Sequence, residues 1–174
     1  MATLKPAVSN KDHVEGNSQA HIELVEYGDY QCPHCGRAYP IIKKIQAAMG
    51  DQLKFVFRNF PLAEIHPNAT RAAIATEAAA LQGKFWPMHD TIFEHQQRLD
   101  DESLLRYATH LKLDAAKFRD DMENNALAQK VEDDFESGVR SGVNGTPSFF
   151  VNGQKYNGDW AEAPFLAYLQ TLIK

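Results

Sequence analysis

The motif Cys32-Pro33-His34-Cys35 constrains this chain most, because it contains the only two cysteines and sits at a strand-to-helix junction. The preceding run His21–Tyr27 alternates in a way typical of a strand. Pro33 stands where a first helical residue needs no N–H, so the motif is predicted to begin a helix. We expect this helix to reach about Met49 and to end at Gly50.

The rest of the chain predicts an α/β protein in which helices separate two sets of strands. We expect strands at Leu53–Phe57, 148–151 and 154–156, and helices over 69–82, 85–95 and 161–173. Two further helices are expected from apolar residues that share one helical face, first Leu104, Leu105, Ala108 and Leu111, and then Leu127, Val131, Phe135 and Val139. Asn152-Gly153 predicts a hairpin between the short strands. Residues 1–20 are expected to form a loose arm.

The geometry of a C-x-x-C motif at a helix start assigns different roles to its two thiols. The first cysteine lies at the N-cap, and the second lies one turn further on, within disulfide reach. Cys32 is therefore the predicted nucleophile, and Cys35 is the predicted resolving thiol. The helix N-terminus should lower the pKa of Cys32, and His34 can add a charge or a donor.

A lowered thiol pKa makes the disulfide a better oxidant, because it stabilises the reduced form. A fall of ~3 units from the usual value of ~8.5 stabilises that form by roughly 2 kcal/mol at pH 7. This corresponds to a couple about 45 mV more oxidising.

Half of a zinc site is the alternative for a C-x-x-C pair, but the chain has no second such pair and no H-x3-5-H spacing. We therefore predict no metal and no cofactor.

Two further positions stand out around the motif. Glu26 shares a strand face with Ile22 and Leu24, so it is expected to be partly buried, with a raised pKa, and could carry the proton of Cys35. A solvated carboxylate at a strand end is the alternative interpretation. Pro147, after Thr146, is expected at a strand entry.

Composition excludes several classes of function. The net charge is −5 and no Lys/Arg-rich cluster occurs, so nucleic-acid binding is not expected. No apolar run is long enough for a membrane span. The polar N-terminus resembles no signal peptide, so a cytoplasmic location is expected. A periplasmic or other extracytoplasmic location is the alternative, because a mature exported protein would look the same.

Three segments together resemble the DsbA-like branch of the thioredoxin superfamily. They are LVEYGDYQCPHCG at 24–36, HPNATRAAIATEAAALQGKFWPMHD at 66–90 and GTPSFFVNG at 145–153. The resemblance implies a thioredoxin-like fold with an inserted helical sub-domain. The arm would occupy 1–20 and the DsbA-like domain 21–174, with its thioredoxin core at about 21–61 and 144–174 and its helical insertion at about 62–143.

The resemblance also implies roles for individual residues. Cys32 would form the mixed disulfide and Cys35 would resolve it, while Pro33-His34 would tune the couple toward oxidation. Glu26 would lie beneath the active site. Pro147 would be a cis-proline beside the disulfide, and Thr146 would dock the substrate backbone by strand-like hydrogen bonds.

The predicted function is thiol–disulfide exchange with protein or peptide thiols. The physiological direction stays open between oxidase, reductase and isomerase; Thr146 before the proline is a feature shared with isomerases. A peptide-binding or chaperone-like module is the alternative from another class. We expect a monomer that an unidentified redox partner recycles.

Overall fold

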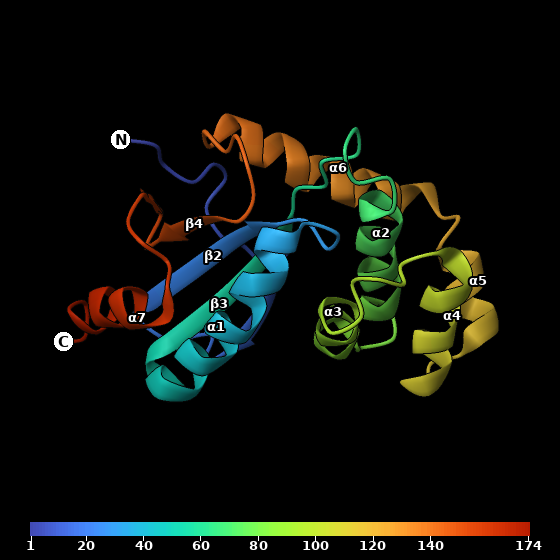
Figure 1. Cartoon of the computed structure of the whole chain (residues 1–174), viewed down its shortest axis with the longest axis horizontal. Helices are drawn as coiled ribbons and strands as arrows, with labels where there is room; N and C mark the ends of the chain where they lie inside the picture. Colours follow the sequence, from blue (N-terminus) through green and yellow to red (C-terminus); the bar gives the residue numbers. More distant parts are fainter.

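The computed structural model describes residues 1–174, and its five strands form one mixed sheet in the order β1-β3-β2-β4-β5 (Figure 1). The strands are β1 (His13–Gly16), β2 (Ile22–Gly28), β3 (Leu53–Asn59), β4 (Ser148–Val151) and β5 (Gln154–Tyr156). The central strand β2 runs parallel to β3 and antiparallel to β4. The predicted hairpin is confirmed, with Asn152 and Gly153 both at positive φ between β4 and β5.

Seven α-helices and one short 3-10 turn surround the sheet and extend away from it. They are α1 (Pro33–Met49), the 3-10 turn η1 (Gly50–Gln52), α2 (Ala69–Ala80), α3 (Phe85–Phe93), α4 (Asp101–His110), α5 (Ala115–Asp121), α6 (Asn125–Arg140) and α7 (Glu162–Gln170). Helix α1 ends as predicted at Gly50, which has a positive φ. The predicted α/β arrangement is confirmed, and α5 is an element that periodicity did not indicate.

The two faces of the sheet pack against different helices. Side chains of Leu24 and Phe55 belong to a large apolar cluster that continues through α1, α7 and the helices α2–α5. Val25 and Val56 point to the other face, where a smaller cluster is covered by Phe135 of α6. Strand β2 is therefore buried on both faces, as expected for the centre of a partly parallel sheet.

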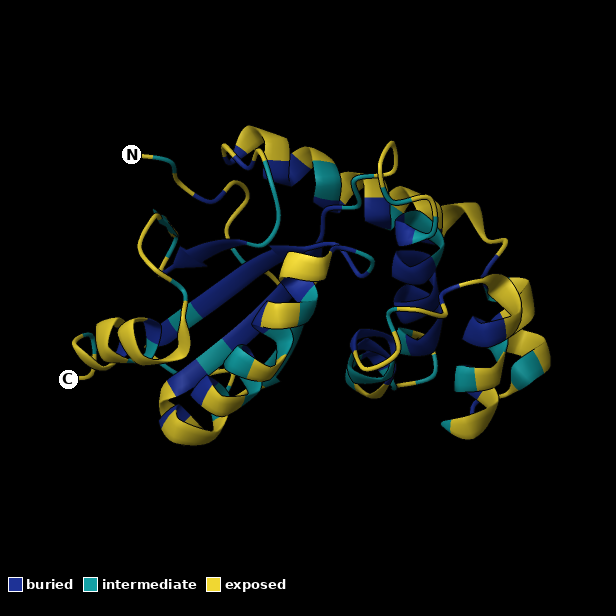
Figure 2. Cartoon of the chain, in the orientation of Figure 1, coloured by how far each residue is buried: buried dark blue, intermediate teal, exposed yellow.

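The helical segment after β3 shares the core of the sheet. Helix α2 is almost entirely buried (Figure 2), because its many alanines allow neighbouring helices to approach closely. The outer faces of α4 and α5 are exposed in the same view. One aromatic group, made by Tyr30, Phe57, His89 and Phe93, joins the active-site turn and β3 to α3. The position of α3 relative to α1 is fixed by this packing.

Two local expectations were wrong. Residues 1–20 are not a loose arm, because β1 pairs antiparallel with β3 and Leu4 is buried. This polar segment is held by tertiary contacts that its own sequence pattern does not show, including an ion pair between Asp12 and Arg58 with a distance of 2.8 Å from Oδ1 to Nε. Val139 is 56% exposed, because the buried side of α6 passes through Asp134 and Gly138, and Val139 lies outside it.

Candidate active site at the start of helix α1

The structure places Cys32 at the N-cap of α1, at the end of the turn that follows β2. Its backbone is extended, with φ −69° and ψ 124°, and Pro33 is the first helical residue. The carbonyl of Cys32 accepts the N–H of Gly36 at 3.0 Å, which closes the first turn. The predicted start of the helix is thus confirmed, and the orphan N–H groups of this turn lie around the Cys32 sulfur.

The two thiols differ sharply in their surroundings. No disulfide joins them, so the pair is in the reduced, dithiol form. Cys32 is 4% exposed, whereas Cys35 is fully buried beneath it. The Cys35 Sγ accepts the backbone N–H of Asp29 at 3.5 Å. Of the two residues, only Cys32 keeps a small exposed fraction.

The pKa values of the two thiols are driven in opposite directions. The pKa of Cys32 falls to about 5, first because the Cys35 thiol donates to its sulfur, and against the opposing effect of burial. The Thr146 hydroxyl and the backbone N–H groups of Cys35 and His34 lower it further. The pKa of Cys35 is raised well above its usual range, first by burial and then by the hydrogen bond that its thiol donates to the Cys32 sulfur.

Thr146 reaches Cys32 from the loop before β4, and Pro147 follows it in that loop. Because β4 pairs with β2, with Ser148 opposite Tyr27, the residues just before β4 lie beside the start of α1. The Thr146–Pro147 peptide bond is cis. In its thiol form, Cys32 Sγ donates to the Thr146 carbonyl at 3.7 Å. The buried Thr146 Oγ1 has no hydrogen-bond partner.

Glu26 lies on β2 behind the motif and is 3% exposed, so the sequence expectation of burial holds. Its Oε2 atom has no hydrogen-bond partner. Burial, and then the negative charge of Cys32, raises the pKa of Glu26 to about 8. Glu26 in turn contributes to the raised pKa of Cys35, so the two groups interact.

The side chain of His34 is exposed. The Arg37 guanidinium donates to His34 Nδ1. The contribution of His34 to the Cys32 thiolate comes through its backbone N–H. The ring charge considered from the sequence is therefore not the main effect at this position.

Asp29 was missed by the sequence analysis, although it connects the active-site turn to the segment after β3. Its carboxylate accepts the N–H groups of Gln31 at 2.7 Å and Cys32 at 3.2 Å. It also accepts the N–H of Leu62 at 2.9 Å and lies 2.7 Å from His66 Nδ1. The turn predicted at Gly28-Asp29 was the available sequence signal for this role, because an Asp side chain in a turn commonly accepts the backbone N–H two residues later.

Gln96 was also missed, and no local sequence signal could have revealed it. Its side-chain amide comes from the segment after α3 and donates to the carbonyls of Tyr30 and Cys32, at 2.9 Å each. Its Oε1 lies over Gly36, where a Cβ atom would be only 2.1 Å away. The helical segment therefore touches the redox helix directly at its first turn.

The site has no metal-binding arrangement, since no group of three or more His, Cys, Asp or Glu side chains gathers to hold an ion. None of the helices combines the length and apolar character needed to cross a bilayer.

Comparison with known families identifies the chain. A family model described as Thioredoxin matches residues 8–171. The chain belongs to the thioredoxin family. A thioredoxin-like oxidoreductase from Silicibacter pomeroyi has a similar structure, with a TM-score of 0.83 and 26% identity, covering 94% of this chain and 92% of that one. The thiol-disulfide exchange protein alpha-DsbA2 from Wolbachia pipientis matches with a TM-score of 0.82 at 22% identity, covering 95% and 89%.

These matches confirm the predicted thioredoxin-like fold and the resemblance to the DsbA-like branch. The prediction of a thiol-disulfide oxidoreductase type of domain is confirmed at the level of family and fold. The division into a core at 21–61 and 144–174 and an insertion at 62–143 stays a prediction.

Curated relatives correct the expected location. The chain is 41% identical over 169 residues to the Na+/H+ antiporter NhaA 1 of Mycolicibacterium vanbaalenii, covering 96% of this chain but 27% of that protein. The chain thus spans about a quarter of the length of the curated relatives it matches. The expectation of a cytoplasmic protein is wrong, because these relatives bear the name of an ion antiporter. Because this chain matches only part of longer proteins, its polar N-terminal residues do not indicate the cellular compartment.

Proposed function

We propose that this domain exchanges disulfides with protein or peptide thiols through a mixed disulfide at Cys32. One observation carries the proposal: the pKa of Cys32 is lowered to about 5, whereas the pKa of the completely buried Cys35 is raised. A thiolate that attacks or leaves readily and a second thiol that stays protonated beside it are the two groups a resolving mechanism needs.

In the oxidising direction, a substrate thiolate attacks Cys32 Sγ of the Cys32–Cys35 disulfide. The Cys35 sulfur leaves, and it takes a proton because its pKa lies above ambient pH. Glu26, with a pKa of about 8, can supply that proton from the buried side. A second substrate thiolate then attacks the substrate sulfur, and Cys32 leaves as a thiolate. Two electrons pass from the substrate to the domain.

The low pKa of Cys32 supports a relatively oxidising couple. Only the part of the shift below ambient pH counts, which at pH 7 stabilises the dithiol form by about 3 kcal/mol. For two electrons this makes the couple roughly 60 mV more oxidising than an unperturbed one. The Thr146 backbone beside Cys32, followed by the cis bond to Pro147, supports docking of an extended substrate strand.

Substrates of this class imply a redox partner that returns the domain to its working state. We propose that a separate, unidentified thiol or disulfide protein does this, and that the domain acts as a monomer. The proposal includes neither a metal nor an organic cofactor.

Equilibration of the full chain with glutathione buffers tests the proposal. The disulfide should be reduced at a potential clearly above that of an unperturbed pair. Cys35→Ser should accumulate a mixed disulfide with a cysteine-containing peptide, whereas Cys32→Ser should not. If trapping is equal in the two variants, or the Cys32 thiolate forms only above pH 8, the assignment is refuted.

A further inference from the structure

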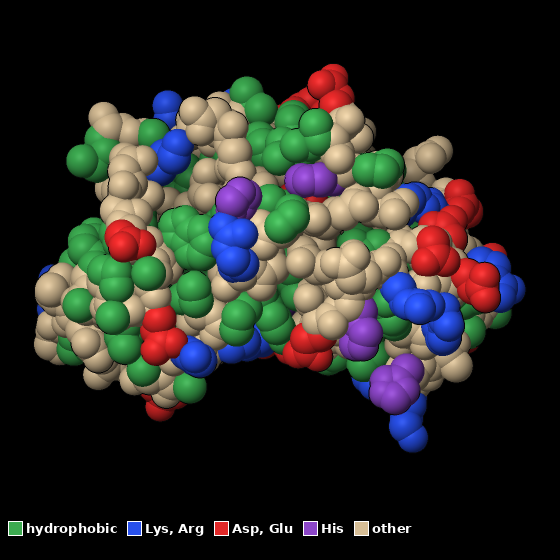
Figure 3. Space-filling view, in the orientation of Figure 1, with side chains coloured by type: hydrophobic (Ala, Val, Ile, Leu, Met, Phe, Trp, Pro, Cys, Tyr) green, Lys and Arg blue, Asp and Glu red, His purple; other side chains and the backbone are tan.

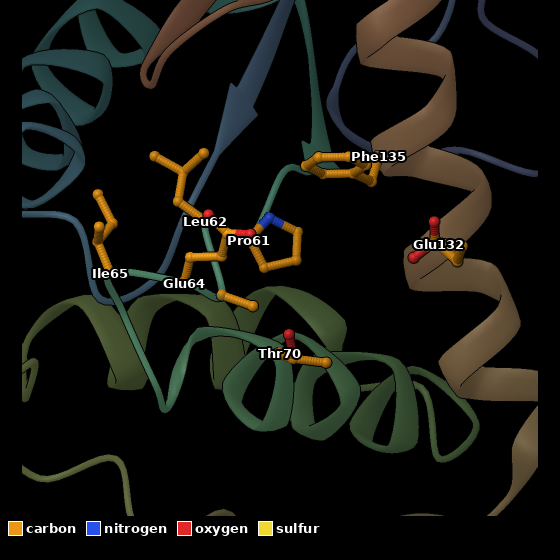
Figure 4. Close-up of a pocket in the computed structure, with 8 residues that line it drawn as sticks. Pro61, Leu62, Glu64, Ile65, Thr70, Glu132 and Phe135 are labelled. Atoms are coloured by element: carbon orange, nitrogen blue, oxygen red, sulfur yellow. The ribbon is translucent and has the colours of Figure 1, made fainter.

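A cavity of about 500 Å³ lies between α6 and the segment that joins β3 to α2, and it is outside the Cys32–Cys35 site (Figure 4). We propose that this cavity binds an extended segment of the protein substrate, receiving a large apolar side chain that is followed by a lysine or arginine. The inference rests on the proposed disulfide exchange and names the substrate sequence that the domain prefers.

The cavity is tied to the reactive cysteine through one carboxylate. Asp29 accepts the backbone N–H of Leu62, which lines the cavity, and the backbone N–H of Cys32. Both segments are therefore within hydrogen-bonding distance of the same side chain. A substrate strand advances about 7 Å over two residues, so a residue close to the substrate cysteine can reach the cavity.

The lining is apolar and partly open to solvent. Pro61, Leu62 and Ile65 come from the connecting segment, and Phe135 comes from α6, where its ring faces Pro61 (Figure 4). Phe135 also stacks on Phe60 with ring centroids 4.3 Å apart, which fixes its orientation. Ile65 is 67% exposed, so an apolar surface at this side of the cavity faces water. A bound apolar side chain would remove this surface from water.

The rim of the cavity is acidic and has no neutralising cation. Glu64 and Glu132 both line it, both are exposed, and neither takes part in an ion pair or a side-chain hydrogen bond. Figure 3 shows hydrophobic side chains with acidic ones beside them at the top of this face, over the region between α6 and α2. Two free carboxylates next to an apolar surface complement a peptide that carries a cation beside an apolar residue.

The test measures one attack step with short peptides of known sequence. The Cys35→Ser chain is loaded at Cys32 with a nitrothiobenzoate disulfide. A peptide thiolate attacks the Cys32 sulfur, the domain–peptide disulfide forms, and the coloured aromatic thiolate leaves, which absorbance follows. The peptides carry Leu-Lys, Ser-Lys, Leu-Glu or Ser-Glu two residues from their single cysteine, on either side.

On one side of the cysteine, the Leu-Lys peptide should react about tenfold faster than the Ser-Glu peptide. Ile65→Ser should remove the advantage of leucine over serine. Paired Glu64→Gln and Glu132→Gln substitutions should remove the advantage of lysine, as should high salt. The matched controls Leu81→Ser and Glu102→Gln alter exposed residues that do not line the cavity and should preserve both preferences.

Each peptide rate is divided by the rate of the same protein with glutathione. Equal normalised rates for the four peptides, or preferences that survive the cavity variants, would overturn the inference while leaving disulfide exchange intact. An absence of reaction with glutathione as well would instead refute the proposed function. Self-association that Ile65→Ser abolishes, with equal peptide rates, would assign the cavity to a second copy of the chain and also overturn the inference.

Discussion

Replacing Glu26 by glutamine should make the reduced protein progressively more stable relative to the wild type as the pH rises from 4.5 to 8. In the folded protein the Glu26 pKa is about 8, against a reference of 4.5 for the unfolded chain. Between these pH values the folded state therefore holds a proton that unfolding releases. The stability of the wild-type protein consequently falls as the pH rises from 4.5 to 8. Glutamine has no such proton to lose.

The size of the effect follows from the width of this window. Each pH unit contributes 1.36 kcal/mol, so the free energy of unfolding of Glu26→Gln should gain about 3 kcal/mol on the wild type between pH 4.5 and pH 7. Any fixed cost of burying the amide is the same at both pH values and cancels in the comparison. Above pH 8 the difference should level off.

Urea unfolding at several pH values, with both proteins kept reduced, measures this trend. The pair should also be compared with Cys32→Ser present, because the Cys32 charge is the second cause of the raised Glu26 pKa. Glu23→Gln is the matched control on the same strand, where the partly exposed carboxylate lies 3.0 Å from Lys54 Nζ and contributes little. A Glu26 difference that stays flat across this pH range would refute the buried, proton-holding carboxyl.

Three further substitutions test the surroundings of the thiols. Thr146→Val removes a hydroxyl that faces the sulfur, so the Cys32 pKa should rise by roughly one unit in an ultraviolet thiolate titration; an unchanged midpoint would contradict that contact. Gln96→Ala removes the amide that donates to two carbonyls and should lower the free energy of unfolding by about 1–2 kcal/mol. The control Gln97→Ala, at an exposed neighbour, should change the free energy of unfolding little, and equal effects of the two substitutions would show that the Gln96 contact does not contribute to stability. Asp29→Ala leaves several donors without an acceptor and should cost about 3 kcal/mol in thermal unfolding, so wild-type stability would show that water replaces the carboxylate.

The sequence by itself was enough for the parts of the fold that depend on near neighbours. The start of α1 at Pro33 follows from a proline that suits the first helical turn, and the β4–β5 hairpin follows from Asn152-Gly153. The face that Glu26 shares with Ile22 and Leu24 followed from the two-residue period of the strand. In each case the deciding interaction spans only a few residues, so it is written in a short stretch of sequence.

The tertiary structure alone decided what surrounds those elements. The edge strand β1, the contacts of Asp29 with Leu62 and His66, and the contact of Gln96 with the first turn of α1 each join residues far apart in the chain. Their sequence segments are polar and aperiodic, so no local preference distinguishes them from ordinary loops. The motif at Cys32–Cys35 thus predicted the chemistry, but the charges and donors that set its two pKa values come together only when distant segments pack around it.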